Sequence, residues 1–290
     1  MFFDEEMLLD LRLNIMNKYV DKFIITEATY MHSGKPKKLI FDINKFSKFK
    51  DKIIYNIVDK EPSNIEIVNN EDDADTRGNK LINNSIKREN YQREMGIESL
   101  RAAENEDIII INDIDEIPNL DKVNFNTINN NIIIFKQKTY YYKFNLAYEK
   151  LIWYGSKACK KKKFISPQWL RNVKHQKYPF WRFDTIFSKK KYSNINYINN
   201  GGWHFTNIKS AEDINKKFSN FLHHQDFEVS GLTLENIKKM IKDNKVLYDL
   251  DVDKRSFKWE GNKKLGKVTM SELPNYLSLN FKKYSKWLDN

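Results

Sequence analysis

Two aspartates at the end of an apolar run are the residues of this sequence best suited to chemistry. Asp113 and Asp115 follow four isoleucines at 108–111 and precede Glu116-Ile117-Pro118. In an extended chain, residues two apart point to the same side at about 6–7 Å, so both carboxylates can reach one hard cation such as Mn²⁺ or Mg²⁺. Such an ion would bind diphosphate oxygens and neutralise charge on a departing nucleoside diphosphate. The alternative is that both carboxylates only cap the following turn.

Further side chains are suited to complete such a site. His204 follows Gly201 and Gly202, which permit a turn closed to other residues, and its imidazole can join a metal shell or contact a phosphate. Arg88 and Arg93 precede the acidic strand on an expected helix and can pair with phosphate oxygens. The alternative interpretations are that His204 is a core residue and that Arg88 and Arg93 lie on a solvated helix face.

Glu27 ends an earlier apolar run and is followed by a turn, Ser33-Gly34-Lys35-Pro36, that could cradle a nucleoside. Ligands of open parallel sheets bind beyond the carboxyl ends of the strands, which predicts that Glu27 lies beside the ligand. A solvated loop carboxylate is the competing interpretation. His223, His224 and Asp226 are alternative metal ligands, although adjacent histidines on a helix point in different directions.

Apolar periodicity predicts the elements that must position these residues. We expect helices at 8–19, 86–103, 210–222, 233–241 and 273–288, strands at 23–26, 53–58, 108–111, 132–135 and 139–144, and a polar loop at 64–84. Strands and helices alternate over the first 120 residues, which favours an α/β fold with a mostly parallel central sheet flanked by helices. Without internal repeats or a clear linker, residues 1–290 are expected to form a single domain.

The composition narrows the class of protein. Of 290 residues, 50 are Lys or Arg and 39 are Asp or Glu, so the net charge of +11 suits phosphates, nucleic acid or acidic polymers. We do not expect nucleic acid as the partner, because it leaves the acidic strand end unexplained. The motifs GxxxxGK[ST], GxGxxG and GxSxG are missing, which argues against phosphate-loop NTPases, dinucleotide-binding folds and serine hydrolases.

The sequence also bears on the compartment. Cys159 is the single cysteine, which excludes an intrachain disulfide and fits a reducing environment. We find no signal peptide and no apolar run of about 18 residues. A soluble, cytoplasmic protein without an integral membrane segment is therefore expected.

Taken together, these residues resemble glycosyltransferase family 17, a family that includes β-1,4-mannosyl-glycoprotein β-1,4-N-acetylglucosaminyltransferase. The order and spacing of several short segments carry the resemblance. They are LLDLR at 8–12, VDKFIITE at 20–27, SGKP at 33–36, RENYQR at 88–93, DIDEIP at 113–118, GWH at 202–204, LPNYL at 273–277 and LDN at 288–290.

The resemblance implies a GT-A fold, a UDP-sugar donor, a divalent cation and inversion at the anomeric carbon. Asp113 and Asp115 match the family's acidic metal motif, and His204 occupies a position where GT-A enzymes often place a metal-binding histidine. Glu27 and Arg93 would contact the nucleotide, and with Arg88 and Asp113 they form the expected donor-binding set. Residues 1–120 would then bind the nucleotide sugar, and 121–290 the acceptor.

Inversion by single displacement needs a base that takes the proton of the acceptor hydroxyl. Asp184 lies between the acidic motif and His204, where inverting GT-A enzymes commonly carry this base. Asp226 and Glu228 are the rival candidates, and each of the three is equally well explained as a surface acid.

The expected reaction is transfer of a sugar, with GlcNAc the leading choice, from UDP to the hydroxyl of a glycan acceptor. Trp153, Trp169 and Trp181 can stack on acceptor sugars, and core packing is their ordinary explanation. The alternative function is a non-catalytic protein that binds a nucleotide sugar or a glycan.

Overall fold

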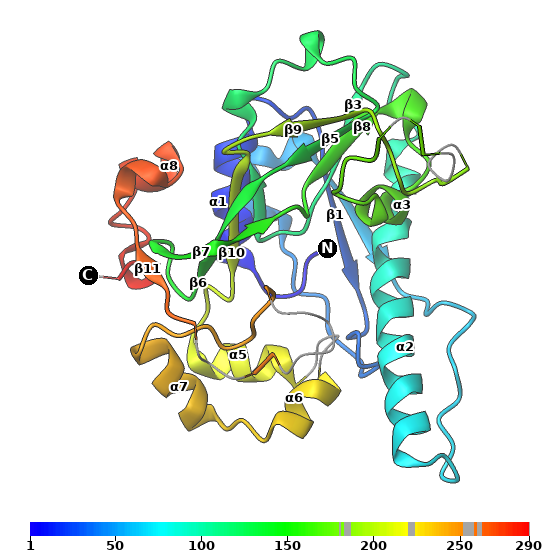
Figure 1. Ribbon diagram of the computed structural model, residues 1–290, viewed down its shortest axis with the longest axis vertical. Helices are drawn as coiled ribbons and strands as arrows, with labels where there is room; N and C mark the ends of the chain where they lie inside the picture. Colours follow the sequence, from blue (N-terminus) through cyan, green and yellow to red (C-terminus); the bar gives the residue numbers. More distant parts are fainter. Residues whose placement is uncertain (180, 183–186, 220–223, 252–257, 260–262, 290) are drawn as a thin grey trace.

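The computed structural model is a mixed α/β structure, in which small sheets lie among helices (Figure 1). It describes residues 1–179, 181–182, 187–219, 224–251, 258–259 and 263–289. The helices are α1 (Glu6–Met16), α2 (Ala74–Glu94), α3 (Pro167–Asn172), α5 (Ala211–Phe218), α6 (His224–Ser230), α7 (Leu234–Lys242) and α8 (Asn275–Leu279). The strands are β1 (Phe23–Ala28), β2 (Ile53–Val58), β3 (Ile108–Ile111), β4 (Glu116–Pro118), β5 (Ile132–Phe135), β6 (Gln137–Tyr141), β7 (Leu146–Trp153), β8 (Lys157–Lys160), β9 (Ile195–Ile198), β10 (Gly202–Thr206) and β11 (Gly266–Lys267).

The first helix and the first three strands confirm the sequence prediction, but the second helix is displaced. Helix α2 begins within the segment expected to be a loop, because the Asp73 side chain accepts a hydrogen bond from the Thr76 amide at 2.7 Å and caps it. Ser85, the expected cap, is instead buried inside the helix and donates to the Leu81 carbonyl at 2.9 Å. After Glu94 the chain tightens into a 3₁₀ turn instead of continuing the helix.

The sheets are mixed, so the expectation of a mostly parallel sheet is wrong. They run β1-β2, β11-β7-β6-β10-β4 and β3-β8-β5-β9. Among the described strands, β1/β2, β6/β10 and β5/β9 pair in parallel, whereas the other pairs are antiparallel. For β6 and β7 the physical reason is connection length: a few residues join these two strands, and parallel neighbours need a crossover of a dozen or more residues.

The second half confirms two predicted helix starts and corrects the last helix. Ser210 accepts from the Asp213 amide at the start of α5, and Thr233 forms a capping box with Asn236 at the start of α7. The predicted helix at 273–288 is reduced to the short α8 and a 3₁₀ turn. Tyr284 nevertheless anchors this tail, since its hydroxyl donates to Asp10 of α1 at 3.0 Å.

The main apolar core draws residues from both halves of the sequence. Leu9 and Leu13 of α1 pack in one cluster with Phe135 of β5 and Tyr284 near the C-terminus. Cys159, in β8, is 1% exposed and is a free thiol. A second cluster joins β6 and β7 to α5, α6 and α7, which lie together at one end of the molecule (Figure 1). These helices therefore cover the end of the sheet where β6 and β10 finish.

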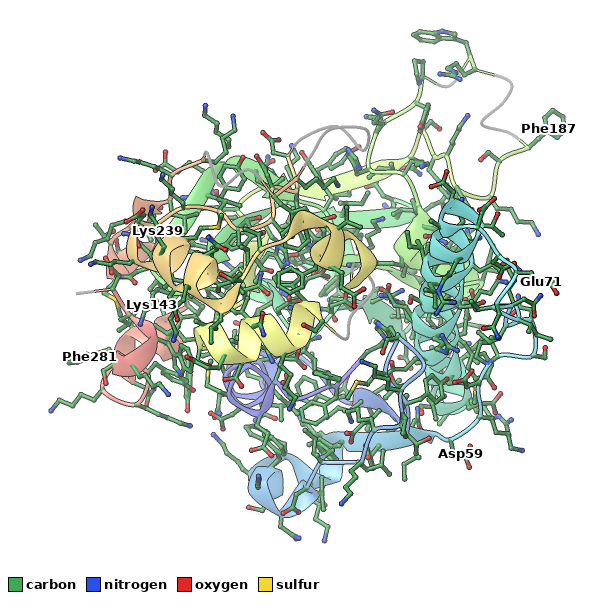
Figure 2. All side chains as sticks on the ribbon, turned by 90° about the horizontal axis from the view of Figure 1, so that it is seen from below. Asp59, Glu71, Lys143, Phe187, Lys239 and Phe281 are labelled. Atoms are coloured by element: carbon green, nitrogen blue, oxygen red, sulfur yellow. The ribbon has the colours of Figure 1, made fainter. Side chains whose placement is uncertain are left out.

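Several large apolar residues of the described chain are exposed, and Phe187, labelled in Figure 2, is 87% exposed. None of the described helices is long and apolar enough to cross a lipid bilayer.

Candidate functional site

A cavity of about 250 Å³ brings together residues from both halves of the chain. Its walls come from the N-terminal residues, the segment after β1, helix α2, the β3–β4 connection, β10 and α5. They include Asp113, Asp115 and His204 of the sequence-predicted metal site. The volume is slightly below the range of about 300–1,000 Å³ that is typical of small-molecule sites. The described residues would thus enclose only part of a nucleotide sugar.

Strand pairing explains why His204 lies beside the acidic segment. Strand β10 pairs antiparallel with β4, which sets His204 opposite Glu116, and the Phe205 amide donates to the Asp115 carbonyl at 2.7 Å. Gly202 has φ of +128°, and a Cβ there would meet the carbonyl of Ile117. A larger residue would push β10 away from β4. The predicted role of this glycine in a restricted turn is thus confirmed.

Asp113 is held by two arginines. Its carboxylate lies 2.7 Å from Nη2 of Arg171 and 3.3 Å from Nη2 of Arg93. Burial alone would raise the pKa of Asp113, but Arg171 and Arg93 together lower it well below its usual range. Sequence reasoning anticipated Arg93 but missed Arg171. No spacing signal could have found it, because Arg171 lies on α3, 58 residues from Asp113.

A further carboxylate, Glu116, was not given a role from the sequence. It is 1% exposed and accepts hydrogen bonds from Arg171 at 2.8 Å and from the indole of Trp153 at 2.6 Å. A Cβ at Gly155 would collide with all three of these side chains. Trp153 also stacks on the His204 ring, with centroids 4.5 Å apart and planes at 16°. This Glu116 cluster therefore fixes the orientation of the histidine.

Asp115 and His204 form the least satisfied part of the cavity wall. The Asp115 carboxylate is 3.8 Å from His204 Nε2, and among the described residues it accepts no hydrogen bond. Burial raises the pKa of Asp115 to about 7 and lowers that of His204 to about 4. His204 Nδ1 is buried and finds no hydrogen-bond partner in the described part of the chain. The Asp115 side chain is 22% exposed, and the charge of Lys217 partly offsets the effect of desolvation on its pKa. A half-buried carboxylate and a buried, neutral imidazole thus face each other without a hydrogen bond between them.

The expected three-residue metal site is not assembled. Within the ranges given above, no group of three or more His, Cys, Asp or Glu side chains is arranged to hold a metal ion. Asp113 differs from the expectation, because its carboxylate forms ion pairs with Arg171 and Arg93. Asp115 and His204 remain adjacent.

The two arginines of the expected donor site have different surroundings. Arg93 is 7% exposed and pairs with Glu89 at 2.8 Å as well as with Asp113. Arg88 is also buried, donates to the His32 carbonyl at 3.3 Å and lies directly under Gly34, where a Cβ would meet its guanidinium. Arg88 therefore supports the turn at 33–36, and neither arginine lines the 250 Å³ cavity.

Glu27 occupies a closed hydrogen-bonding network. Its carboxylate is 0% exposed and accepts from the amides of Ile40 and Phe41 at 2.9 and 3.1 Å, from the Tyr55 hydroxyl at 2.8 Å and from Lys37. Glu27 also lies outside the cavity wall. These contacts account for the burial of Glu27 by its role in holding the fold together. Contact of Glu27 with a nucleotide stays a prediction.

The candidates for the base are not brought to the cavity by the described residues. Glu228, on α6, is exposed and does not line the cavity. Asp184 lies outside the described residues. Asp226 belongs to α6, but its side chain also lies outside what the structure describes.

With this geometry in view, the sequence comparison decides the family. The family model for glycosyltransferase family 17 matches residues 1–289. The chain belongs to glycosyltransferase family 17. No curated protein and no solved structure gives a significant match. Membership of family 17 makes the chain a glycosyltransferase, so that a sugar donor and a glycan acceptor are its partners.

Proposed function

We propose that this chain is a metal-dependent, inverting glycosyltransferase that moves GlcNAc from UDP-GlcNAc to a hydroxyl of a glycan. The observation that carries the proposal is a cavity in which Asp115 and His204 face each other without strong partners, in a chain of glycosyltransferase family 17.

The residues present fit part of the shell of a divalent cation. A carboxylate without a hydrogen-bond donor and a neutral imidazole are the forms in which both side chains bind metals. The Trp153 stack and the Glu116 cluster orient the imidazole, as partners of ligating histidines commonly do. Mn²⁺ or Mg²⁺ held by Asp115 and His204 would offset the charge that develops on the departing UDP.

Arg171, which lines the cavity, would serve the diphosphate. The Asp113 carboxylate holds Arg171 in place, so its geometry is fixed before a ligand arrives, whereas Arg93 lies behind the cavity wall and its contact with the nucleotide stays a prediction. Fixed guanidinium groups stabilise developing phosphate charge without reorganisation at the moment of reaction. In the expected single displacement, the acceptor oxygen bonds to the anomeric carbon, the bond from that carbon to UDP breaks, and a carboxylate takes the hydroxyl proton. Asp184, Asp226 and Glu228 remain the candidates for that carboxylate.

UDP release tests this proposal directly. The protein with Mn²⁺ is incubated with a panel of nucleotide sugars and glycan acceptors, and free UDP is measured. We expect release with UDP-GlcNAc above all other donors, loss of release after exhaustive chelation, and recovery when Mn²⁺ is returned. Undiminished turnover in chelator would refute the metal dependence. Calorimetric binding of UDP without release from any donor would favour the non-catalytic alternative.

A further inference from the structure

A buried lysine lies in the sheet behind the candidate site. Lys157 begins β8, where it pairs with Ile111 of β3 on one side and with Ile134 of β5 on the other, and it is 6% exposed. A charged side chain is costly to bury unless hydrogen bonds or an ion pair satisfy it. Burial lowers the pKa of Lys157 to about 7. The partners of the ammonium group therefore indicate what this lysine does.

Those partners are backbone groups at the end of helix α3. Lys157 Nζ donates to the carbonyl of Arg171 at 2.6 Å and to that of Val173 at 2.5 Å. The last carbonyls of a helix have no partner within it, and cationic side chains are suited to bind them. Among the described residues, these two carbonyls accept no other hydrogen bond and Lys157 forms no ion pair. The ammonium group thus holds the chain at residues 171–173.

Arg171 is the residue of this segment that reaches the site. Its Nη2 lies 2.7 Å from the carboxylate of Asp113 and 2.7 Å from that of Glu116, and its guanidinium lies 6.0 Å from the centre of the Trp153 ring. Arg171 also lines the 250 Å³ cavity. Lys157 holds the backbone of Arg171, and the two carboxylates hold its side chain. Contacts at both ends of a long side chain restrict the rotamers that it can adopt.

We propose that Lys157 is a positioning residue for the transfer reaction and that it acts through Arg171. By holding the end of α3, Lys157 places the Arg171 guanidinium at the cavity wall, where this group would meet the diphosphate of the sugar donor. The inference rests on the proposed function, in which Arg171 acts on the departing UDP. Lys157 does not itself line the cavity, so it contacts neither the substrate nor the reacting atoms.

Loss of this positioning should affect kcat more than KM for the donor. Negative charge grows on the diphosphate as the sugar departs, so a well-placed guanidinium binds the transition state more strongly than the ground state. A displacement of about 1 Å at such a group can cost roughly 100-fold in rate. A lysine that only stabilised the sheet would leave kcat of the folded protein unchanged.

Lys157→Met tests the inference, because methionine keeps the apolar part of the side chain but removes the ammonium group. The matched control is Lys160→Met on the same strand, where the ammonium pairs with the exposed Glu106 at 2.8 Å. Each substitution is made in the parent and in Arg171→Lys, in which an ammonium cannot bridge both carboxylates. Lys157→Gln, which keeps a neutral donor, replaces Lys157→Met if the latter does not fold. UDP release from UDP-GlcNAc with Mn²⁺ gives kcat and KM well below the Tm of every variant.

We expect Lys157→Met to lower kcat about tenfold or more and to change KM by less than about twofold. In Arg171→Lys, the same substitution should lower kcat by less than about twofold, because the guanidinium that it would displace is already missing. Lys160→Met should leave both constants unchanged. Unchanged kcat in folded Lys157→Met, or an equal loss of kcat in the parent and in Arg171→Lys, would overturn the inference.

Thermal unfolding of the same variants separates this inference from the proposed function, because it needs no substrate. If Lys157 holds Arg171 on its carboxylates, Lys157→Met should lower Tm more in the parent than in Arg171→Lys. A parent protein that releases no UDP would contradict the proposed function, and the Tm comparison would still decide whether Lys157 positions Arg171. Equal losses of Tm in both backgrounds would assign Lys157 to the general stability of the fold and overturn the inference.

Discussion

Replacement of Asp115 by Asn should stabilise the protein in the absence of metal while removing its activity. Burial raises the pKa of the folded carboxyl from 3.8 to about 7, so the folded state holds a proton that the unfolded state has already released. Between these two values the folded state binds more protons than the unfolded state, and stability therefore falls as pH rises. The loss begins near pH 4 and is complete near pH 7.

The size of this destabilisation follows from the shift of about three units in the pKa of Asp115. Each unit corresponds to about 1.4 kcal/mol, so the ionised carboxylate lowers the free energy of unfolding by roughly 4 kcal/mol above pH 7. The side chain is 22% exposed, which leaves little solvent screening. For a chain of this size, Asp115→Asn should raise Tm by roughly 5–10 °C at about pH 8 in chelator.

Thermal unfolding of both proteins in chelator, from about pH 4 to pH 8, measures this effect. Most of the advantage of Asp115→Asn should be lost near pH 4, because the free energy difference vanishes as the pH falls below the unfolded pKa of 3.8 and the carboxyl becomes protonated in both states. Asp113→Asn is the matched control, for which we expect a decrease in Tm. It removes one of the two carboxylates that each of Arg93 and Arg171 contacts, while Glu89 and Glu116 remain, and should destabilise by about 1–3 kcal/mol. A Tm of Asp115→Asn equal to or below that of the parent at pH 8 would refute the view of Asp115 as a buried carboxylate without a partner.

Three other substitutions test the surroundings of the site. Gly155→Ala forces a Cβ into the Glu116 cluster and should lower both Tm and UDP release, whereas Gly78→Ala, which meets nothing within 4 Å, should stabilise α2 by up to about 1 kcal/mol. Arg171→Lys should lower kcat for UDP release, because an ammonium group cannot bridge two carboxylates as a guanidinium does; unchanged kcat would exclude a role for the bridge. Glu27→Gln should lower Tm, since it breaks a buried ion pair; calorimetry with UDP then separates a purely structural role, which leaves UDP affinity unaltered, from the predicted nucleotide contact, which weakens it.

The fold was predictable from sequence where apolar runs are short and closed by polar residues. Strands β1, β2 and β3 follow directly from such runs. The start of helix α2 was not predictable from sequence, because the N-terminal half of this helix is rich in Asn, Asp and charged residues, a composition equally typical of a loop. The local cap at Asp73 decides the outcome. Strand direction was also missed, because it depends on features such as the tight connection between β6 and β7, which no apolar period reveals.

The residue types of the candidate site were predictable from sequence, but the contacts between their side chains were not. Asp115 and His204 lie together as their positions after β3 and in β10 suggested. Of the two partners of Asp113, Arg93 was anticipated, whereas Arg171 reaches it through a tertiary contact of which spacing along the chain carries no trace. Glu27 illustrates the reverse case. It ends a strand as expected, but the amides of residues 40–41 fold back over it and close it from the cavity.

The burial of Cys159 has a practical consequence for spectroscopy. Burial raises the pKa of its thiol to about 12, so the thiolate that reacts with alkylating reagents is scarce near neutral pH. Maleimide dyes and nitroxide spin labels should therefore leave the native chain unmodified. They should attach only to a cysteine introduced at the surface, for example at Ile67, which is 77% exposed. Distances within the protein can thus be measured by fluorescence energy transfer or electron paramagnetic resonance without first removing the native thiol.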